Sequence, residues 1–168
     1  KAGALAAATL GQNAGAQSEW PALLALQLMA GGEPKAEALI QRHLSHADAR
    51  SEVHIGYART LVEQGRSADA HRQLDALIRQ APERPEAWLV RGALYADERN
   101  DAAAEADLQR YLGLLAAAEQ AEPGAEPPEG RDHARIMLAG IAERRGDLTA
   151  AEQLLASVDS PERALSVQ

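Results

Sequence analysis

The 168-residue chain contains no cysteine, which excludes a disulfide framework, a thiolate metal cage and a thiol nucleophile, and leaves the redox compartment undetermined. It has no phenylalanine, two tryptophans and three tyrosines, so the aromatic residues that favour strands are scarce. Charged residues interrupt every apolar run before it reaches the roughly 18 residues that span a bilayer. These absences disfavour an all-β fold and a membrane-spanning segment.

The residues that are present favour helices. The chain has 38 alanines and 22 leucines, both strong helix formers, and we predict an all-α fold in one globular unit. Its 17 basic and 25 acidic residues give a net charge of −8, which would repel phosphates. We therefore expect no nucleic-acid partner.

The chain repeats with a period of 34 residues. Three columns of side chains recur at this spacing: Trp20, His54 and Trp88; Ala36, Ala70 and Ala104; and Ile40, Leu74 and Leu108. A further jump of 47 residues, which is 34 plus 13, carries Ala104 to Ala151 and Leu108 to Leu155. Several columns agree at once, so we take the period as the organising feature of the fold.

Each repeating unit is predicted to contain two helices joined by a tight turn. Gly65 and Gly146 can adopt the left-handed conformation that ends a helix, and Asn100 is expected to do so after Arg99. The second helices are expected to begin at the N-capping residues Ser67, Asp101 and Asp147.

This pattern resembles the tetratricopeptide repeat, most clearly at Trp88, Gly92, Tyr95, Ala104, Leu108 and Tyr111 and at Ala58, Leu61, Gly65, Ala70, Leu74, Leu77 and Pro82. The resemblance covers nearly the whole chain. His54 and Arg91 depart from it, because a bulky apolar residue and a leucine are usual at these positions. The resemblance implies a right-handed superhelical solenoid of stacked antiparallel helix pairs.

The register divides this single solenoid domain into four complete repeats, at residues 17–50, 51–84, 85–118 and 132–165. Residues 1–16 are expected to form the second helix of a truncated repeat and a turn, and residues 166–168 to begin a further repeat. We therefore expect the chain to be a central segment of a larger protein.

An acidic segment rich in proline and glycine, residues 119–131, separates the third and fourth repeats. Proline and glycine exclude a continuous helix there. The segment is interpreted as an acidic surface loop, with partner binding as the alternative.

No motif predicts catalysis, so we expect no enzyme and no cofactor. His43 and His46 lie three residues apart and could share a metal ion, with His54 eight residues further on. His43 occupies the column of Leu77 and Tyr111, so we interpret it as a packing residue and predict no metal site.

The first helix of each repeat is expected to line a concave groove. The predicted groove residues are Glu52, Ile55, Arg59, Val62, Glu63, Glu86, Leu89, Val90, Ala93, Asp97, His133, Ile136, Met137 and Arg144. This apolar ledge edged by carboxylates would suit a protein or peptide with apolar anchors and basic flanks. Alternatively, Ile55, Leu89 and Ile136 only cover neighbouring helices. Family members that grip the acidic carboxyl terminus of chaperones present Lys and Asn on this face, whereas Glu52, Glu86 and Ala93 stand here.

The resulting hypothesis is a non-catalytic protein-interaction scaffold. The chain resembles central segments of bacterial proteins with many such repeats, often exported ones that help to assemble envelope structures, which favours an exported location over a cytoplasmic one. The alternative is a regulatory interaction region of a larger enzyme whose catalytic domain lies elsewhere. Self-association through open solenoid ends is left open by the sequence.

Overall fold

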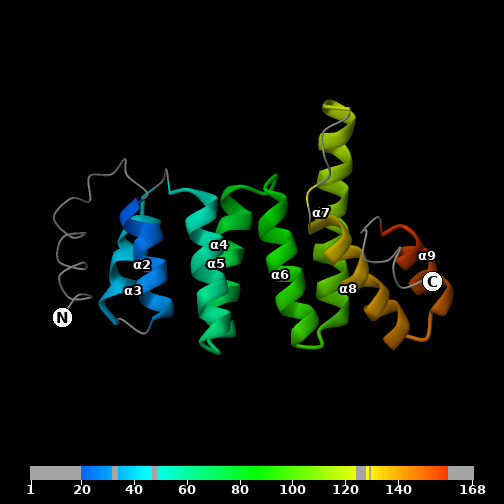
Figure 1. Ribbon diagram of the computed structural model, residues 1–168, viewed down its shortest axis with the longest axis horizontal. Coiled ribbons are helices and arrows are strands. Elements are labelled where there is room, and N and C mark those ends of the chain that lie inside the picture. The colour runs from blue at the N-terminus through cyan, green and yellow to red at the C-terminus, as the bar shows by residue number, and fades with distance from the viewer. Residues whose placement is uncertain (1–19, 32–33, 47–48, 124–127, 129, 159–168) are drawn as a thin grey trace, which may run out of the picture. The chain divides into compact units, whose positions relative to one another are not determined.

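The computed structural model describes residues 20–31, 34–46, 49–123, 128 and 130–158 (Figure 1). Within these ranges the chain forms eight α-helices and no strand, which confirms the predicted all-α class. The helices are α2 (Trp20–Ala30), α3 (Pro34–Leu44), α4 (Ser51–Glu63), α5 (Ser67–Gln80), α6 (Pro85–Asp97), α7 (Asp101–Ala121), α8 (Gly130–Arg144) and α9 (Leu148–Ala156). The expectations for residues 1–16 and 166–168 lie outside the described residues.

The chain divides into two compact units, residues 1–80 and residues 81–168. In the first unit α2 pairs with α3 and α4 with α5, and α4 also packs against α2 and α3. In the second unit α6 pairs with α7 and α8 with α9, and α8 also packs against α6 and α7. Each unit is therefore a stack of helix pairs, as the resemblance to tetratricopeptide repeats implies.

Small side chains bring the helices of the first unit together. Ala36 in α3 and Ala70 in α5, both from the repeating alanine column, are fully buried. A Cβ placed on Gly56 of α4 would lie only 2.8 Å from Cδ1 of Leu26 in α2. An alanine at residue 56 would therefore force the Leu26 side chain to move.

The core of the second unit joins α7 to α8. Its buried residues are Ala104, Leu108, Tyr111, Leu115, Ala134, Leu138 and Ile141. A Cβ on Gly92 of α6 would lie 3.0 Å from Cγ of Leu108, so α6 crosses α7 in close contact. The alanine column thus lies in the interior, as do Ile40, Leu74 and Leu108, whereas Leu155, assigned to the same column, is 41% exposed.

Three helices, α4, α6 and α8, end in the same hydrogen-bond pattern, the Schellman motif. The amide of Gly65 donates to the carbonyl of Val62, and the amide of Arg66 donates to that of Leu61. The turn after α6 repeats these two bonds with Arg99 and Asn100, and the turn after α8 repeats them with Gly146 and Asp147. The φ angles of Gly65, Arg99 and Gly146 are 72°, 61° and 79°, respectively.

These turns correct three sequence predictions. The left-handed residue after α6 is Arg99, not Asn100, which instead caps α7 by accepting a hydrogen bond from the Ala103 amide at 3.4 Å. Ser67 and Asp101 are the first helical residues of α5 and α7 and not their caps. Asp147 does cap α9, because its carboxylate accepts from the Ala150 amide at 3.0 Å.

Each unit contains an ion pair in which one arginine donates to both oxygens of a carboxylate, and the two pairs differ in how far they are buried. In the first unit Arg66 donates to both carboxylate oxygens of Glu37 at 2.9 and 2.8 Å, and the Tyr57 hydroxyl donates to the same carboxylate at 2.6 Å. In the second unit Arg91 donates to both oxygens of Asp107 at 2.7 and 2.9 Å. The Arg66 and Glu37 side chains are 38% and 26% exposed, whereas those of Arg91 and Asp107 are 16% and 7% exposed.

Candidate functional site

The predicted groove residues lie on α4, α6 and α8, and none of them is buried. Ile136 is 49% exposed, whereas Val90, Ala93 and Met137 are partly covered. Leu89 packs against the start of α8, since a Cβ on Gly130 would lie 2.7 Å from its Cδ2 atom. That contact favours the covering role for Leu89 and leaves Ile136 as the most exposed apolar side chain of the predicted groove.

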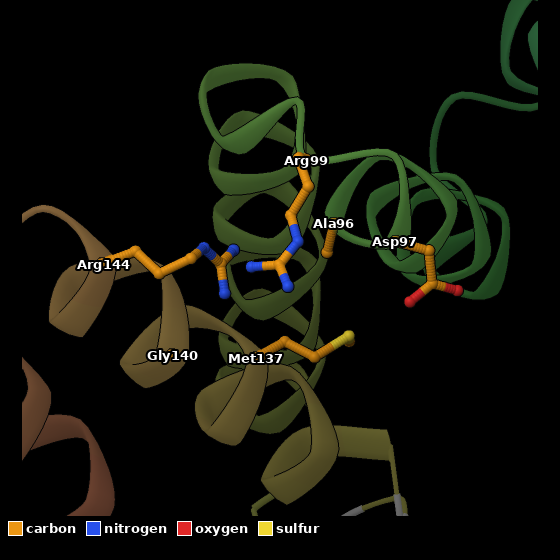
Figure 2. Close-up of a pocket in the computed structure, with 6 residues that line it drawn as sticks. All are labelled: Ala96, Asp97, Arg99, Met137, Gly140 and Arg144. Atoms are coloured by element: carbon orange, nitrogen blue, oxygen red, sulfur yellow. The ribbon is translucent and has the colours of Figure 1, made fainter.

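A shallow depression of about 310 Å³ opens between α6 and α8 in the second unit. It is lined by Ala96, Asp97, Arg99, Met137, Gly140 and Arg144 (Figure 2). The packing of α8 against α6 brings these two short segments, more than 35 residues apart in the chain, to one surface. Three of the residues, Asp97, Met137 and Arg144, belong to the predicted groove set.

The cationic side of the depression is formed by Arg99 and Arg144. Figure 2 shows the two side chains reaching toward one another, with their guanidinium groups adjacent. Arg144 comes from the last turn of α8, and Arg99 lies in the turn that follows α6. The carboxylate of Asp97 points away from both guanidinium groups in the same view.

Arg144 is held in place by one carboxylate. Its Nε atom donates to Oδ2 of Asp101 at 3.1 Å, and its Nη2 atom donates to the other carboxylate oxygen. The hydrogen bond from Arg144 keeps the pKa of Asp101 below its ordinary value. The remaining terminal nitrogen, Nη1, lies 3.6 Å from where a Cβ on Gly140 would be, so it faces the lining of the depression.

Arg99 is the charged lining residue that the groove prediction missed. Within the described part of the chain its side chain makes no hydrogen bond or ion pair, although its charge adds to the hydrogen bond from Arg144 in lowering the pKa of Asp101. The signal was present, because residue 99 follows Gly65 by 34 residues and therefore replaces the glycine of the turn. What the sequence could not show is that its guanidinium would meet Arg144.

A second hollow, of about 250 Å³, lies between α7 and α8 and is also lined by two arginines, Arg131 and Arg135. Both are already engaged. Arg131 donates to Glu119 at 3.1 Å, and Arg135 donates to the backbone carbonyl of Ser157. The arginines of this hollow therefore have fewer hydrogen-bond donors left for an incoming anion than the arginines of the depression beside Arg99 have.

The histidines do not assemble a metal centre. Among residues 20–31, 34–46, 49–123, 128 and 130–158, no group of three or more His, Asp or Glu side chains could hold a metal ion. His54 is 5% exposed, and burial lowers its pKa. Within the same ranges, no helix is both long and apolar enough to cross a membrane.

Comparison with known proteins gives one match. A tetratricopeptide-repeat family model matches residues 27–96, which extend from α2 through most of α6. Searches of the curated proteins and of the solved structures gave no match. The matched stretch contains the columns and turns on which the resemblance was based, including Ala36, Ala70 and Gly65. Residues 27–96 belong to the tetratricopeptide repeat family, whose members generally mediate protein–protein interactions and are typically non-catalytic.

Proposed function

We propose that the chain is a non-catalytic interaction module that binds a protein or peptide on the first helices of the helix pairs within each unit. The observation that carries this proposal is the surface of α6 and α8: partly covered Val90 and Ala93 lie on α6, and partly covered Met137 lies on α8 beside exposed Ile136 in the sequence. Exposed apolar side chains beside a depression are the usual anchors of a protein interface. The groove residues of α4, among them Ile55 and Val62, are proposed to serve the same function in the first unit.

The test is site-specific photo-crosslinking in the native host. A photoreactive amino acid at residue 136 is expected to form a discrete crosslinked product with another protein, identified by mass spectrometry. Leu148 of α9 provides the matched control, because it is 61% exposed but begins the second helix of its pair. Equal crosslinking from residues 136 and 148 would contradict the proposed binding face.

A charge substitution complements the crosslinking. Ile136→Glu is expected to weaken capture of the crosslinked protein at least about tenfold, because a carboxylate in an apolar contact must lose its hydration. The helical circular dichroism should stay unchanged, since residue 136 contributes little to the core. Leu148→Glu should leave capture intact.

The finer role that the resemblance implies, assembly of envelope structures by an exported bacterial protein, forms part of this proposal. Its support is the resemblance together with an alanine-rich, cysteine-free composition that is compatible with export. Fractionation of host cells tests it directly. Confinement of the protein to the cytoplasmic fraction would contradict the envelope role while leaving the binding proposal intact.

A further inference from the structure

The depression between α6 and α8 contains a pair of cations whose charge is only partly balanced. Arg144 uses two of its nitrogens on Asp101, and the charge of Arg99 acts on that same carboxylate without an ion pair, so one carboxylate serves two guanidinium groups among the described residues. Like charges placed side by side repel one another, and an anion between them relieves that repulsion. The pair is therefore arranged to receive a further negative group.

The backbone of Arg99 gives a second, independent reason to assign it a role. Its φ of 61° lies in the left-handed region, where a side chain is disfavoured and glycine is the usual residue. The same motif carries Gly65 and Gly146 at the other two turns. A strained residue at a surface depression is a reason to look for a function of its side chain.

The surroundings specify what kind of anion fits. The rest of the lining comprises the apolar side chains of Ala96 and Met137, Gly140, which adds no side chain, and Asp97, whose carboxylate points away from both guanidinium groups (Figure 2). Guanidinium groups bind carboxylates through paired, charge-assisted hydrogen bonds. An acidic residue followed or preceded by an apolar one would satisfy both parts of this lining.

The geometry points to an extended peptide whose Asp or Glu side chain lies between Arg99 and Arg144, while a neighbouring apolar side chain packs on Met137. This inference rests on the proposed function, and it specifies the partner at this end of the binding face as acidic. It differs from the basic flanks expected from the sequence, because that expectation counted Asp97 and did not include Arg99.

The test uses the full chain and two defined probes, the amidated peptides acetyl-Leu-Glu-Leu-amide and acetyl-Leu-Gln-Leu-amide. Side-chain Nε–H resonances of Arg99 and Arg144 are followed by NMR during titration. The Glu probe is expected to shift both resonances saturably and to bind at least about tenfold more tightly than the Gln probe. Equal binding of the two probes, or no saturable shift with the Glu probe, would overturn the inference.

Variants separate the role of Arg99 from a general loss of structure. Arg99→Gly is expected to abolish the preference for Glu while making the protein more resistant to denaturant. A loss of binding in a more stable protein cannot result from unfolding. Arg145→Gln is the matched control, because Arg145 pairs with Glu105 and does not line the depression; it should keep the preference. Retention of the preference in Arg99→Gly would refute the assignment.

A third probe, acetyl-Leu-Leu with a free terminal carboxylate, checks the commitment to a side-chain carboxylate. Binding as tight as that of the Glu probe would overturn that commitment in favour of a chain terminus. The outcome is also separable from the proposed function. If residue 136 crosslinks to a partner but the Glu probe binds no more tightly than the Gln probe, the proposed binding face is supported and only its preference for an acidic side chain is rejected.

Discussion

The turns after α4 and α6 have the same backbone hydrogen bonds but different residues in the left-handed position. Gly65 adopts its φ of 72° without cost, whereas Arg99 at 61° carries a strain of about 1–2 kcal/mol. The comparison teaches that the hydrogen-bond pattern, and not glycine itself, defines this turn. Where glycine is replaced, the side chain needs its own explanation, and Arg99 has one in the depression beside Arg144.

A parallel difference distinguishes the polar contacts inside the two units. Residues 57 and 91 are one period apart, yet Tyr57 donates to half-buried Glu37 while Arg91 forms an ion pair with buried Asp107. Arg91 also lies over the Trp88 and Tyr95 rings, at 5.1 and 5.9 Å from their centroids. At this position of the repeat, the second unit therefore has a charged arginine in an ion pair, whereas the first unit has the neutral hydroxyl of a tyrosine.

The largest expected effect is the loss of the buried pair. Asp107→Ala should reduce the free energy of unfolding by about 3–5 kcal/mol, because it removes the buried carboxylate that accepts two hydrogen bonds from the Arg91 guanidinium. Chemical denaturation measures the loss, and hydrogen exchange should locate it in α6 and α7. Glu37→Ala in the first unit is the comparison and should cost clearly less, since its carboxylate is partly exposed. Equal losses would contradict this difference.

The double variant Arg91→Leu with Asp107→Leu tests whether the loss in Asp107→Ala comes from removing only one partner of the buried ion pair. Replacing both charges by apolar side chains should restore most of the stability that Asp107→Ala removes. A double variant no more stable than the single one would show that the pair contributes more than charge compensation.

Exchanging the turn residues should give smaller, opposite effects. Gly65→Arg should destabilise the protein by about 1–2 kcal/mol, and Arg99→Gly should stabilise it by a similar amount, because the φ angles are almost the same. Urea denaturation of the two variants checks the signs. A destabilising Arg99→Gly would mean that Arg99 makes structural contacts that outweigh its backbone strain.

Acidification should weaken the first unit before the second. Burial, aided by the charge of nearby His43 from α3, lowers the pKa of His54 in the folded protein. As the pH falls, His54 is therefore protonated in the unfolded chain at a higher pH than in the folded one. The side chain of Gln73 from α5 opposes this shift, and α2 contributes no titratable group. The free energy of unfolding is therefore not reduced by His54 above its ordinary pKa of 6.5, and it decreases as the pH falls below that value.

Glu37 adds to this trend at lower pH. Hydrogen bonds from Arg66 and Tyr57 lower its pKa, so its contribution is present above 4.5 and is lost as pH falls through the lowered value. Hydrogen exchange at pH 7.5 and 5.5 should show earlier opening of α4 than of α7, and His54→Phe should reduce the difference. An unchanged pH response in His54→Phe would exclude His54 as its source.

The smallest effect is expected at the exposed pair between Arg144 and Asp101. Asp101→Asn should leave the denaturation midpoint almost unchanged, because solvent screens the interaction. Asp107→Asn provides the buried counterpart and should lower it clearly. A comparable loss in both variants would show that exposure does not explain the difference between these two ion pairs of the second unit.

Much of the fold was accessible from the sequence because the 34-residue period fixes which residues face inward. Ala36, Ala70 and Ala104 form one column of this period, and all three are fully buried. The departure at Arg91 was also visible. Its partner was not, since a charge 16 residues away can be identified only after α6 has packed against α7.

The candidate site was less predictable for the same physical reason. Asp97, Met137 and Arg144 were expected on the binding face from helical spacing alone. Arg99 belonged to a turn signal, and its approach to Arg144 depends on how α8 packs against α6. Leu89 shows the converse, because spacing placed it on the groove while its contact with the start of α8 makes it part of the packing.

The left-handed arginine has a consequence for how this protein can change over generations. Every arginine codon becomes a glycine codon through a single base change, and here that change would relieve strain at the turn. Selection for robustness alone would therefore drive residue 99 toward glycine. Sequences of closely related organisms offer a natural experiment, in which arginine should persist only where the acidic partner does.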